Sequence, residues 1–442
     1  MSIFKAYDVR GIYPEQINEE VIYKIGRAFV QFFGFDAVIV GRDMRLSSPQ
    51  LSTALINGIL DQGANVINIG IVGTEVLNFS SGFLNKAGIM ITASHNPSEY
   101  NGIKPCAPGA VSIGENNGLM DIKRLVENNS FDDSEKGSLK EFDVWPDYKN
   151  KILSFTNQEN LKPLRIVVDA GNGMGGKLVS KVFSELPFEI VPLYFEEDGS
   201  FPNHQPSPIE SKNLIDLKKK VIEENASLGI AFDGDADRVF FIDENGDDID
   251  SSFIISLIAK HTLSEKPQSK ILYNLVCSKI IPETIKEFGG EAVIERVGHS
   301  FIKPKMSKEN IVFGGEHSGH YFYKDYWFNE SSLITSLIIL EMICQENKTI
   351  SEIIIPLQKY FKIEETNFEV PDKNIMIQKL EQNYSMGAIS KLDGLTIEFD
   401  NWWFNVRPSN TEPVLRLNLE ANSEDLQKEK LKEIKNLIKT SS

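Results

Sequence analysis

The stretch LRIVVDAGNGMGG, residues 164–176, joins an apolar run to a glycine-rich turn. Its first half has the composition of a buried β-strand, and a helical pattern follows the turn. The same order recurs in FDAVIVGRDMR, residues 35–45, and in SKILYNLVCSK, residues 269–279. Strands that alternate with helices are typical of α/β units around parallel or mixed sheets. The sequence therefore predicts an α/β fold that contains three such units.

The glycines of the first stretch also match a known cofactor pattern. Gly171, Gly173 and Gly176 spell G-x-G-x-x-G after a strand, which is the fingerprint of dinucleotide-binding proteins. That fingerprint needs an acidic residue about 20 positions further on, and Glu189 and Glu196 meet this need only loosely. We therefore interpret the glycines as a strand-to-helix turn that requires close packing.

Length and composition narrow the classes of function. A chain of 442 residues, 41% hydrophobic and 25% charged, is expected to be globular and divided into several domains. We find no apolar run long enough to span a bilayer and no signal-peptide pattern at the N-terminus. Three widely separated cysteines fit a reducing compartment, so the sequence predicts a cytoplasmic protein with no membrane partner. The net charge of −17 argues against nucleic acid as a partner, and an anionic substrate would need locally concentrated cations.

Polar, turn-rich segments divide the chain into four expected domains. Their predicted ranges are 1–146, 147–250, 251–364 and 365–442. A helix is expected to begin after a capping Asn18 and to end at Gly34. A second amphipathic helix is expected over residues 423–439, with Leu426, Leu431, Ile434 and Ile438 facing inward.

The motif DGDADR, residues 233–238, carries the clearest local signal. Asp233, Asp235 and Asp237 alternate between two apolar runs, and three such carboxylates repel one another unless a cation lies between them. An EF-hand calcium loop is excluded, because Arg238 occupies the sixth position, where that loop requires glycine. The sequence predicts a divalent metal site, with a solvated acidic turn as the alternative.

The stretch ITASHNPSEYNGIK, residues 91–104, leaves two interpretations open. Asn and Pro are common turn formers, so the segment is consistent with an ordinary turn. It is equally consistent with a rigid loop that presents the hydroxyl of Ser94 for chemistry.

Other segments have the composition of anion and sugar sites. The segment NVRPSNTEP surrounds Arg407 with short polar side chains, which suits a phosphate cradle or an ordinary loop about equally. GGEHSGH places polar side chains on a glycine-rich loop that suits sugar hydroxyls, with a bare loop that holds a structural histidine as the alternative. VGHS is a further candidate for the same site. In AYDVRG and GRDMR a salt-bridged turn is the default explanation, although Arg10 beside a glycine is also a candidate anion contact.

The motifs AYDVRG, TASHNP, DGDADR, GEHSGH and RPSNTEP occur together and in this order. With them, essentially the whole chain resembles the α-D-phosphohexomutase superfamily of phosphomannomutases and phosphoglucomutases. The resemblance implies three related mixed α/β domains and a C-terminal α+β domain around a central cleft. These domains would carry, in turn, the phosphoserine, metal-binding, sugar-binding and phosphate-binding loops.

The resemblance also implies a role for each motif. Ser94 would carry a phosphoryl group, and Mg²⁺ would be held by the three aspartates with Ser94 as a further ligand. Arg238 would steady the reacting phosphate, and Lys104 and His320 would handle protons. His95 is expected to be structural or supportive, because adjacent side chains usually diverge and it would be poorly aimed to act as a base for Ser94. The substrate-binding residues would be Arg10, His299, Glu316, Ser318, Arg407, Ser409, Asn410 and Thr411.

The implied reaction interconverts hexose 1-phosphate and hexose 6-phosphate through the phosphoserine and a hexose 1,6-bisphosphate. Mannose is the expected physiological sugar and glucose a second substrate, with a phosphoglucomutase, a phosphoglucosamine mutase and a phosphoserine phosphomonoesterase as alternatives. A catalytically silent sugar-phosphate binding protein is the alternative from another class. The chain is expected to act as a monomer or homodimer.

Two positions depart from the family pattern. Several members carry a basic residue where this chain has Val276, and an acidic family position after the sugar loop corresponds here to Glu330.

Overall fold

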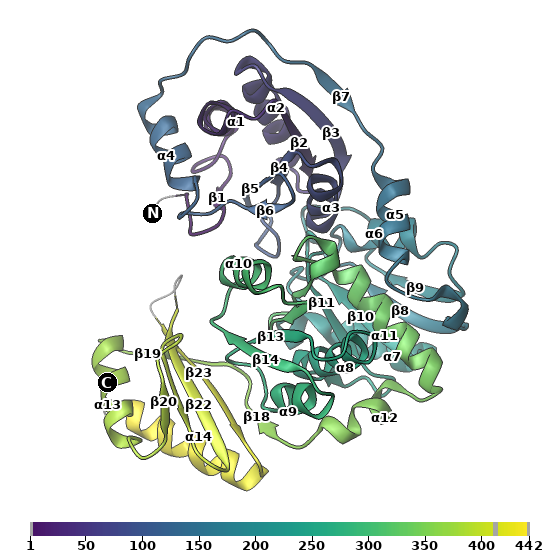
Figure 1. Ribbon diagram of the computed structural model, residues 1–442, viewed down its shortest axis with the longest axis vertical. Coiled ribbons are helices and arrows are strands. Elements are labelled where there is room, and N and C mark those ends of the chain that lie inside the picture. The colour runs from purple at the N-terminus through teal and green to yellow at the C-terminus, as the bar shows by residue number, and fades with distance from the viewer. Residues whose placement is uncertain (1–2, 410–413, 440–442) are drawn as a thin grey trace. The chain divides into compact units, whose positions relative to one another are not determined.

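The computed structural model describes residues 3–409 and 414–439. The chain forms two compact units (Figure 1). The first comprises Met1–Ile249, Met306–Phe313 and Ser318–Ile353, and the second comprises Asp250–Lys305, Gly314–His317 and Ile354–Ser442.

The first unit begins with a mixed sheet in the order β1-β5-β4-β2-β3-β7, with β6 paired to β5. The central strand β2 runs parallel to both of its neighbours, whereas β5 is antiparallel to β1 and β4. The strands are β1 (Val9–Ile12), β2 (Ala37–Arg42), β3 (Asn65–Ile71), β4 (Ala87–Ile91), β5 (Tyr100–Ala107), β6 (Val111–Ser112) and β7 (Leu139–Glu141). The helices are α1 (Glu19–Phe33), α2 (Ser48–Asp61), α3 (Thr74–Leu84) and α4 (Leu119–Asn128).

The first helix confirms its sequence signals. The side chain of Asn18 accepts a hydrogen bond from the backbone N–H of Val21 at 3.1 Å, which caps the N-terminus of α1. Gly34 ends the helix in a left-handed conformation with φ of 66°, which glycine adopts without steric cost. Ile25 and Phe29 face inward and are completely buried against the sheet.

A second mixed sheet in this unit has the order β12-β11-β10-β8-β9. Strand β8 is parallel to β9 and β10, and β10 forms an antiparallel hairpin with β11. The strands are β8 (Leu164–Asp169), β9 (Phe188–Leu193), β10 (Leu228–Phe232), β11 (Val239–Ile242) and β12 (Asp248–Ile249). Helices α5 (Trp145–Leu153), α6 (Gly175–Val182) and α7 (Ile215–Glu224) accompany them.

The chain between residues 250 and 357 contributes to both units. Strand β13 pairs in parallel with β14, and β16 pairs in antiparallel with β17. The strands are β13 (Lys270–Asn274), β14 (Glu291–Glu295), β15 (Phe313–Gly315), β16 (Tyr321–Tyr323) and β17 (Asn329–Glu330). The helices are α8 (Ser251–Glu265), α9 (Ile280–Glu287), α10 (His299–Glu309), α11 (Ser332–Glu346) and α12 (Ile350–Ile354).

The C-terminal part of the second unit is an antiparallel sheet in the order β18-β23-β22-β21-β20, with β19 also paired to β23. Its core contains Phe404 and Leu417, and Ile434 of α14 is completely buried against it. The strands are β18 (Phe361–Lys362), β19 (Thr366–Glu369), β20 (Ala388–Ser390), β21 (Leu395–Glu398), β22 (Trp402–Pro408) and β23 (Val414–Ala421). The helices are α13 (Lys373–Asn383) and α14 (Glu424–Lys439).

The predicted fold class is confirmed by these mixed α/β sheets and the antiparallel C-terminal sheet. Each of the three strand-turn-helix segments forms the expected elements, namely β2 with α2, β8 with α6 and β13 with α9. One detail differs from the sequence analysis. The polar segment before Trp145 contributes an exposed strand, β7, because its backbone pairs with the edge of β3. None of the helices described here is long and apolar enough to cross a membrane.

Candidate active site

The DGDADR motif forms the tip of the β10–β11 hairpin (Figure 1). Phe232 and Val239 are directly paired, so residues 233–238 close a tight loop between them. Ala236 takes a left-handed conformation with φ of 57° within this loop. The loop gathers Asp233, Asp235 and Asp237, whose ligand oxygens all lie within 4.8 Å of one another and are buried.

Two carboxylate oxygens of this loop are placed to bind a cation. One oxygen of Asp235, Oδ1, and one of Asp237, also Oδ1, are buried and accept no hydrogen bond from any residue that the structure describes. Burial, together with the charges of Asp237 and Asp235, raises the pKa of Asp233 well above its usual value. Buried carboxylate oxygens that repel one another are the donor set that a hard divalent cation prefers. These residues therefore fit a metal ion.

Lys104 of β5 neutralises part of this charge. Its Nζ atom donates hydrogen bonds of 2.7 Å to Oδ2 of both Asp235 and Asp237. Burial alone would lower the pKa of this amine, but the two carboxylates outweigh burial and raise the pKa of Lys104 above its ordinary value. The lysine is therefore a fixed positive charge beside the aspartates.

Ser94 lies beside the same aspartates, on the loop that follows β4. Its side chain is buried, and its Oγ donates a hydrogen bond of 2.9 Å to Oδ2 of Asp233. The residue has a left-handed backbone with φ of 51°, which is uncommon for a residue with a side chain. The backbone N–H of Ser94 donates to Oγ1 of Thr92 at 2.9 Å, which helps to hold this conformation.

The expectation that His95 points away from Ser94 is wrong. The Nδ1 atom of His95 lies 3.1 Å from Oγ of Ser94. The left-handed backbone of Ser94 explains the contact, because the rule that adjacent side chains diverge applies to extended chains. The charge of Arg238, followed by burial, lowers the pKa of His95 well below its usual value, so the ring is neutral.

Two further predicted residues lie at the rim of the aspartate loop. The Nε atom of Arg238 is 3.6 Å from Asp233, and the Nε2 atom of His320 is 3.6 Å from Oδ1 of Asp237. The Oγ atom of Ser318 lies 3.0 Å from Nδ1 of His320, which links these two members of the GEHSGH loop.

Arg10 on β1 reaches the Ser94 loop. Its Nη1 atom donates to the side-chain oxygen of Asn96 at 2.6 Å, and its Nη2 atom pairs with Asp8 at 2.5 Å. In the first unit, the aspartate loop is therefore contacted by Ser94, Lys104, Arg238 and His320. Ser318 is joined to it through His320, and Arg10 reaches the neighbouring Ser94 loop.

The remaining predicted residues lie in the second unit. Glu316 is buried, and its Oε1 atom accepts hydrogen bonds from Asn274 at 3.3 Å and from the backbone N–H of Gly298 at 2.9 Å. His299 is the first residue of α10, next to Gly298. The candidate sugar loop and the VGHS segment are therefore joined through one carboxylate.

Arg407 of β22 is held by a residue that the sequence analysis did not single out. Its Nη2 atom pairs with Oε2 of Glu365 at 2.5 Å, and Asn418 donates to the same oxygen at 2.9 Å. Burial would raise the pKa of Glu365, but Arg407 and other partners lower it below its usual value. The backbone N–H of Ser409 donates to Val414 at 2.9 Å. The predicted residues Asn410 and Thr411 lie outside the described residues.

His317 connects the sugar loop electrostatically to this arginine. Its Nδ1 atom lies 3.0 Å from the amide nitrogen of Asn274. Burial, reinforced by the charge of Arg407, lowers the pKa of His317 to about 3, so this ring is neutral. The alternation of polar residues in GEHSGH was the available signal, but it could not show which histidine faces the arginine.

The two positions compared with the family pattern, Val276 and Glu330, both lie in the interior of the fold. Val276 is completely buried. Glu330 is buried on β17, opposite Phe322. The glycine-rich turn after β8 packs on the aspartate loop, since a Cβ atom added at Gly173 would meet the Gly234 oxygen at 2.6 Å. This close approach agrees with the packing role that we preferred over dinucleotide binding.

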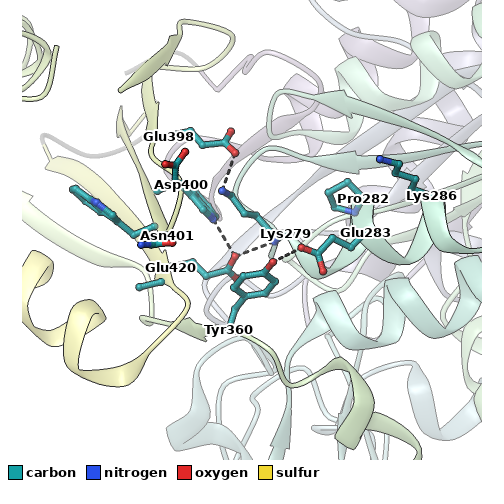
Figure 2. Close-up of a pocket in the computed structure, with 12 residues that line it drawn as sticks. Lys279, Pro282, Glu283, Lys286, Tyr360, Glu398, Asp400, Asn401 and Glu420 are labelled. Carbon is teal, nitrogen blue, oxygen red and sulfur yellow. Dashed lines mark hydrogen bonds and ion pairs between the residues drawn. The ribbon is translucent and has the colours of Figure 1, made fainter. Parts of the chain in front are cut away.

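A pocket of about 380 Å³ in the second unit includes none of the predicted site residues (Figure 2). Several of its polar groups are paired: Lys279 lies 2.8 Å from Glu398, and Tyr360 donates to Glu283. Glu420 accepts from the backbone N–H of Lys279 at 3.0 Å.

Comparison with known proteins gives one consistent result. Sequence models of phosphoglucomutase/phosphomannomutase domains match in succession: alpha/beta/alpha domains I, II and III at residues 1–133, 146–246 and 250–360, and the C-terminal domain at residues 365–437. The chain is 38% identical over 456 residues to a phosphomannomutase of Vibrio cholerae, covering 99% of this chain and 98% of that protein. It is 37% identical over 443 residues to a phosphomannomutase of Methanocaldococcus jannaschii, with coverage of 99% and 98%. A crystal structure of a phosphoglucomutase/phosphomannomutase family protein from Burkholderia thailandensis matches with a TM-score of 0.90 and 32% identity, covering 99% of this chain and 97% of that one.

Proposed function

The chain belongs to the phosphoglucomutase/phosphomannomutase family of the α-D-phosphohexomutase superfamily, and from this membership we propose a mechanism, a cofactor and a substrate for it. The reaction is the interconversion of hexose 1-phosphate and hexose 6-phosphate through a hexose 1,6-bisphosphate. One observation supports the mechanism above all others. The Oγ atom of Ser94 lies 2.9 Å from an aspartate of a buried triple-carboxylate loop that also binds Lys104.

In this mechanism Ser94 exchanges a phosphoryl group with the sugar. The bond from phosphorus to Oγ breaks, a bond from phosphorus to the sugar hydroxyl oxygen forms, and the hydroxyl proton leaves to a base. His320 is our candidate acceptor for that proton. Lys104, whose pKa is raised by Asp235 and Asp237, is already protonated and serves better as a positive charge for the phosphate oxygens.

The metal ion in this proposal is Mg²⁺, held by Asp233, Asp235 and Asp237 with Ser94 or its phosphate as a further ligand. When bound, it would neutralise charge on the transferring phosphate. The protein's own part is to hold Ser94 still and to place Arg238 within reach of the same group.

Substrate recognition is assigned to the second unit and to the GEHSGH loop. Arg407, with Ser409, Asn410 and Thr411, would bind the phosphate that does not react. Glu316, His299 and Ser318 would contact the sugar hydroxyls, and Arg10 would contact a phosphate. Each phosphate would occupy the Arg407 cradle during one half of the cycle.

Mannose phosphate is the proposed physiological substrate, with glucose phosphate as a second. The relatives that carry the name phosphomannomutase support mannose. The two sugars differ only in the orientation of the 2-hydroxyl. A lost hydroxyl contact costs about 1–3 kcal/mol, so an enzyme that makes no contact with the 2-hydroxyl is expected to convert both sugars. Comparing kcat/KM for mannose, glucose and glucosamine phosphates tests the assignment. A strong preference for glucosamine phosphate would overturn it.

The same assay separates the alternatives. A phosphoserine phosphatase would release inorganic phosphate in proportion to the substrate consumed, whereas a mutase retains the phosphate in the isomerised sugar. A silent binding protein would do neither. We also propose a cytoplasmic location, which three separate free cysteines support. The proposed oligomeric state is a monomer or a homodimer.

A further inference from the structure

The motif GRDMR, whose default interpretation was a salt-bridged turn, places a fully buried arginine behind the Ser94 loop. The terminal nitrogens of Arg45 donate hydrogen bonds to backbone carbonyl oxygens of that loop. The Nη1 atom reaches Pro97 at 2.8 Å and Tyr100 at 2.9 Å, and the Nη2 atom reaches Ser94 at 2.7 Å and Asn96 at 2.6 Å. One guanidinium therefore organises the whole turn from residue 94 to residue 100.

Four carbonyl groups that point toward one place need a positively charged group with several hydrogen-bond donors. Carbonyl dipoles that point at a common centre repel one another, and inside the protein they have no water to satisfy them. A planar guanidinium has donors on two terminal nitrogens in a fixed fork, whereas a lysine ammonium is a compact charge with three donors. Lysine at this position would keep the charge and lose part of the geometry.

The guanidinium is itself held from the opposite side. The Nε atom of Arg45 lies 3.3 Å from Oδ2 of Asp43, and Ser48 donates to Oδ1 of Asp43 at 2.5 Å. The ring of Phe201 lies over the guanidinium, with its centroid 5.0 Å from Cζ. The backbone at Gly199 passes so close that an added Cβ atom would lie 2.5 Å from the Arg45 Cα atom.

The carbonyl and the side chain of Ser94 are thus fixed in different directions. The carbonyl oxygen is bound by Arg45, while Oγ is bound to Asp233 at 2.9 Å. The left-handed backbone of Ser94, with φ of 51°, joins these two orientations and is unfavourable for serine without such support. We propose that Arg45 is a positioning residue for phosphoryl transfer, because it holds the Ser94 peptide in the conformation that aims Oγ at the aspartate loop.

This inference rests on the proposed role of Ser94, and Arg45 acts only through the backbone of the loop. The test compares Arg45→Lys with Arg42→Lys, which changes a half-buried arginine of the same segment. Within residues 3–409 and 414–439 its side chain donates one hydrogen bond, to the Asp43 carbonyl at 3.4 Å. Three quantities are measured for each variant and for the wild type. They are kcat and KM for the hexose phosphate, the fraction of Ser94 phosphorylated after incubation with glucose 1,6-bisphosphate, and hydrogen exchange of the backbone in residues 92–101.

For Arg45→Lys we expect kcat to fall about 10²-fold, the cost typical of a reacting group displaced by about 1 Å, while KM stays near the wild-type value. The phosphorylated fraction of Ser94 should fall, and exchange should rise in residues 92–101 while the rest of the unit keeps its protection. Arg42→Lys should match the wild type in all three measurements. Asp43→Asn, which loosens the guanidinium without removing it, should show a smaller loss of kcat with the same unchanged KM.

A kcat of Arg45→Lys close to the wild-type value would overturn the proposal. So would a loss of activity matched by exchange throughout the unit, or a failure of both Arg45→Lys and Asp43→Asn to fold, because each outcome describes a purely structural residue. If the wild type itself forms no phosphoserine at position 94, the proposed function fails instead. In that case the exchange measurement still decides whether Arg45 holds the loop.

Discussion

The exchange of Arg407 for lysine probes the proposed phosphate cradle. Arg407 is almost completely buried on β22, and Glu365 holds its Nη2 atom at 2.5 Å. Lysine keeps the positive charge and can still pair with Glu365. It cannot present the two parallel N–H groups with which a guanidinium binds a phosphate. The substitution therefore removes one charge-assisted hydrogen bond and leaves the net charge of the cradle unchanged.

The expected size of the effect follows from that single bond. A hydrogen bond to a charged group contributes about 1.5–3 kcal/mol, and each 1.4 kcal/mol corresponds to about a tenfold change in binding. We therefore expect KM for hexose phosphates to rise about 10- to 100-fold. Folding should change little, because Glu365 keeps Asn418 at 2.9 Å and Arg416 at 3.3 Å as partners.

The assay measures KM in both directions, with mannose 1-phosphate and with mannose 6-phosphate, and thermal unfolding serves as the folding check. Arg416→Lys is the matched control, because Arg416 lies directly opposite Arg407 on β23 and contacts the same carboxylate. The control should leave both KM values near those of the wild type. If Arg407→Lys impaired only one direction, the two phosphates would not share this cradle and the reorientation of the bisphosphate would be refuted.

Two further predictions concern the metal and a buried acid. Chelation should abolish turnover, and added Mg²⁺ should restore it. The variant Asp235→Asn should lower both activity and metal affinity. If activity survives exhaustive chelation, DGDADR is only an acidic turn. Glu75, buried between Tyr148 and Ser332, has its pKa raised by burial from 4.5 to about 7, so stability should fall as pH rises between these values, by about 3 kcal/mol in total. Unfolding midpoints from pH 4.5 to pH 8 should show this loss in the wild type and not in Glu75→Gln, and equal slopes would contradict it.

The sequence predicted those features that a local pattern encodes. Alternating aspartates between two apolar runs predicted a metal site, and residues 233–238 form a hairpin tip whose buried carboxylates could hold a metal ion. The cap at Asn18 was predicted from the preference of asparagine for helix N-termini, and the inward face of the C-terminal helix from its helical periodicity. Such features depend on residues only a few positions apart.

Other features depend on contacts that no local pattern displays. Arg45 binds backbone carbonyls about 50 positions away. Because every residue has a backbone carbonyl, the sequence cannot show which of them an arginine binds. The contact between His95 and Ser94 follows from one left-handed residue. Glu365 lies in a segment that the sequence marked only as a boundary, and its role emerges because β19 pairs with β23. The four predicted domain ranges stay predictions.

The central claim is that Ser94 carries the phosphoryl group between the two positions of the sugar. A rapid-quench experiment with mannose 1-phosphate labelled in its phosphate, on enzyme already phosphorylated at Ser94, tests it most directly. The claim predicts that mannose 6-phosphate forms, that label appears on Ser94 within the first turnovers, that little free phosphate is released, and that Ser94→Ala forms no product while remaining folded. Formation of mannose 6-phosphate with Ser94 unlabelled, or release of the label as inorganic phosphate, would contradict the claim.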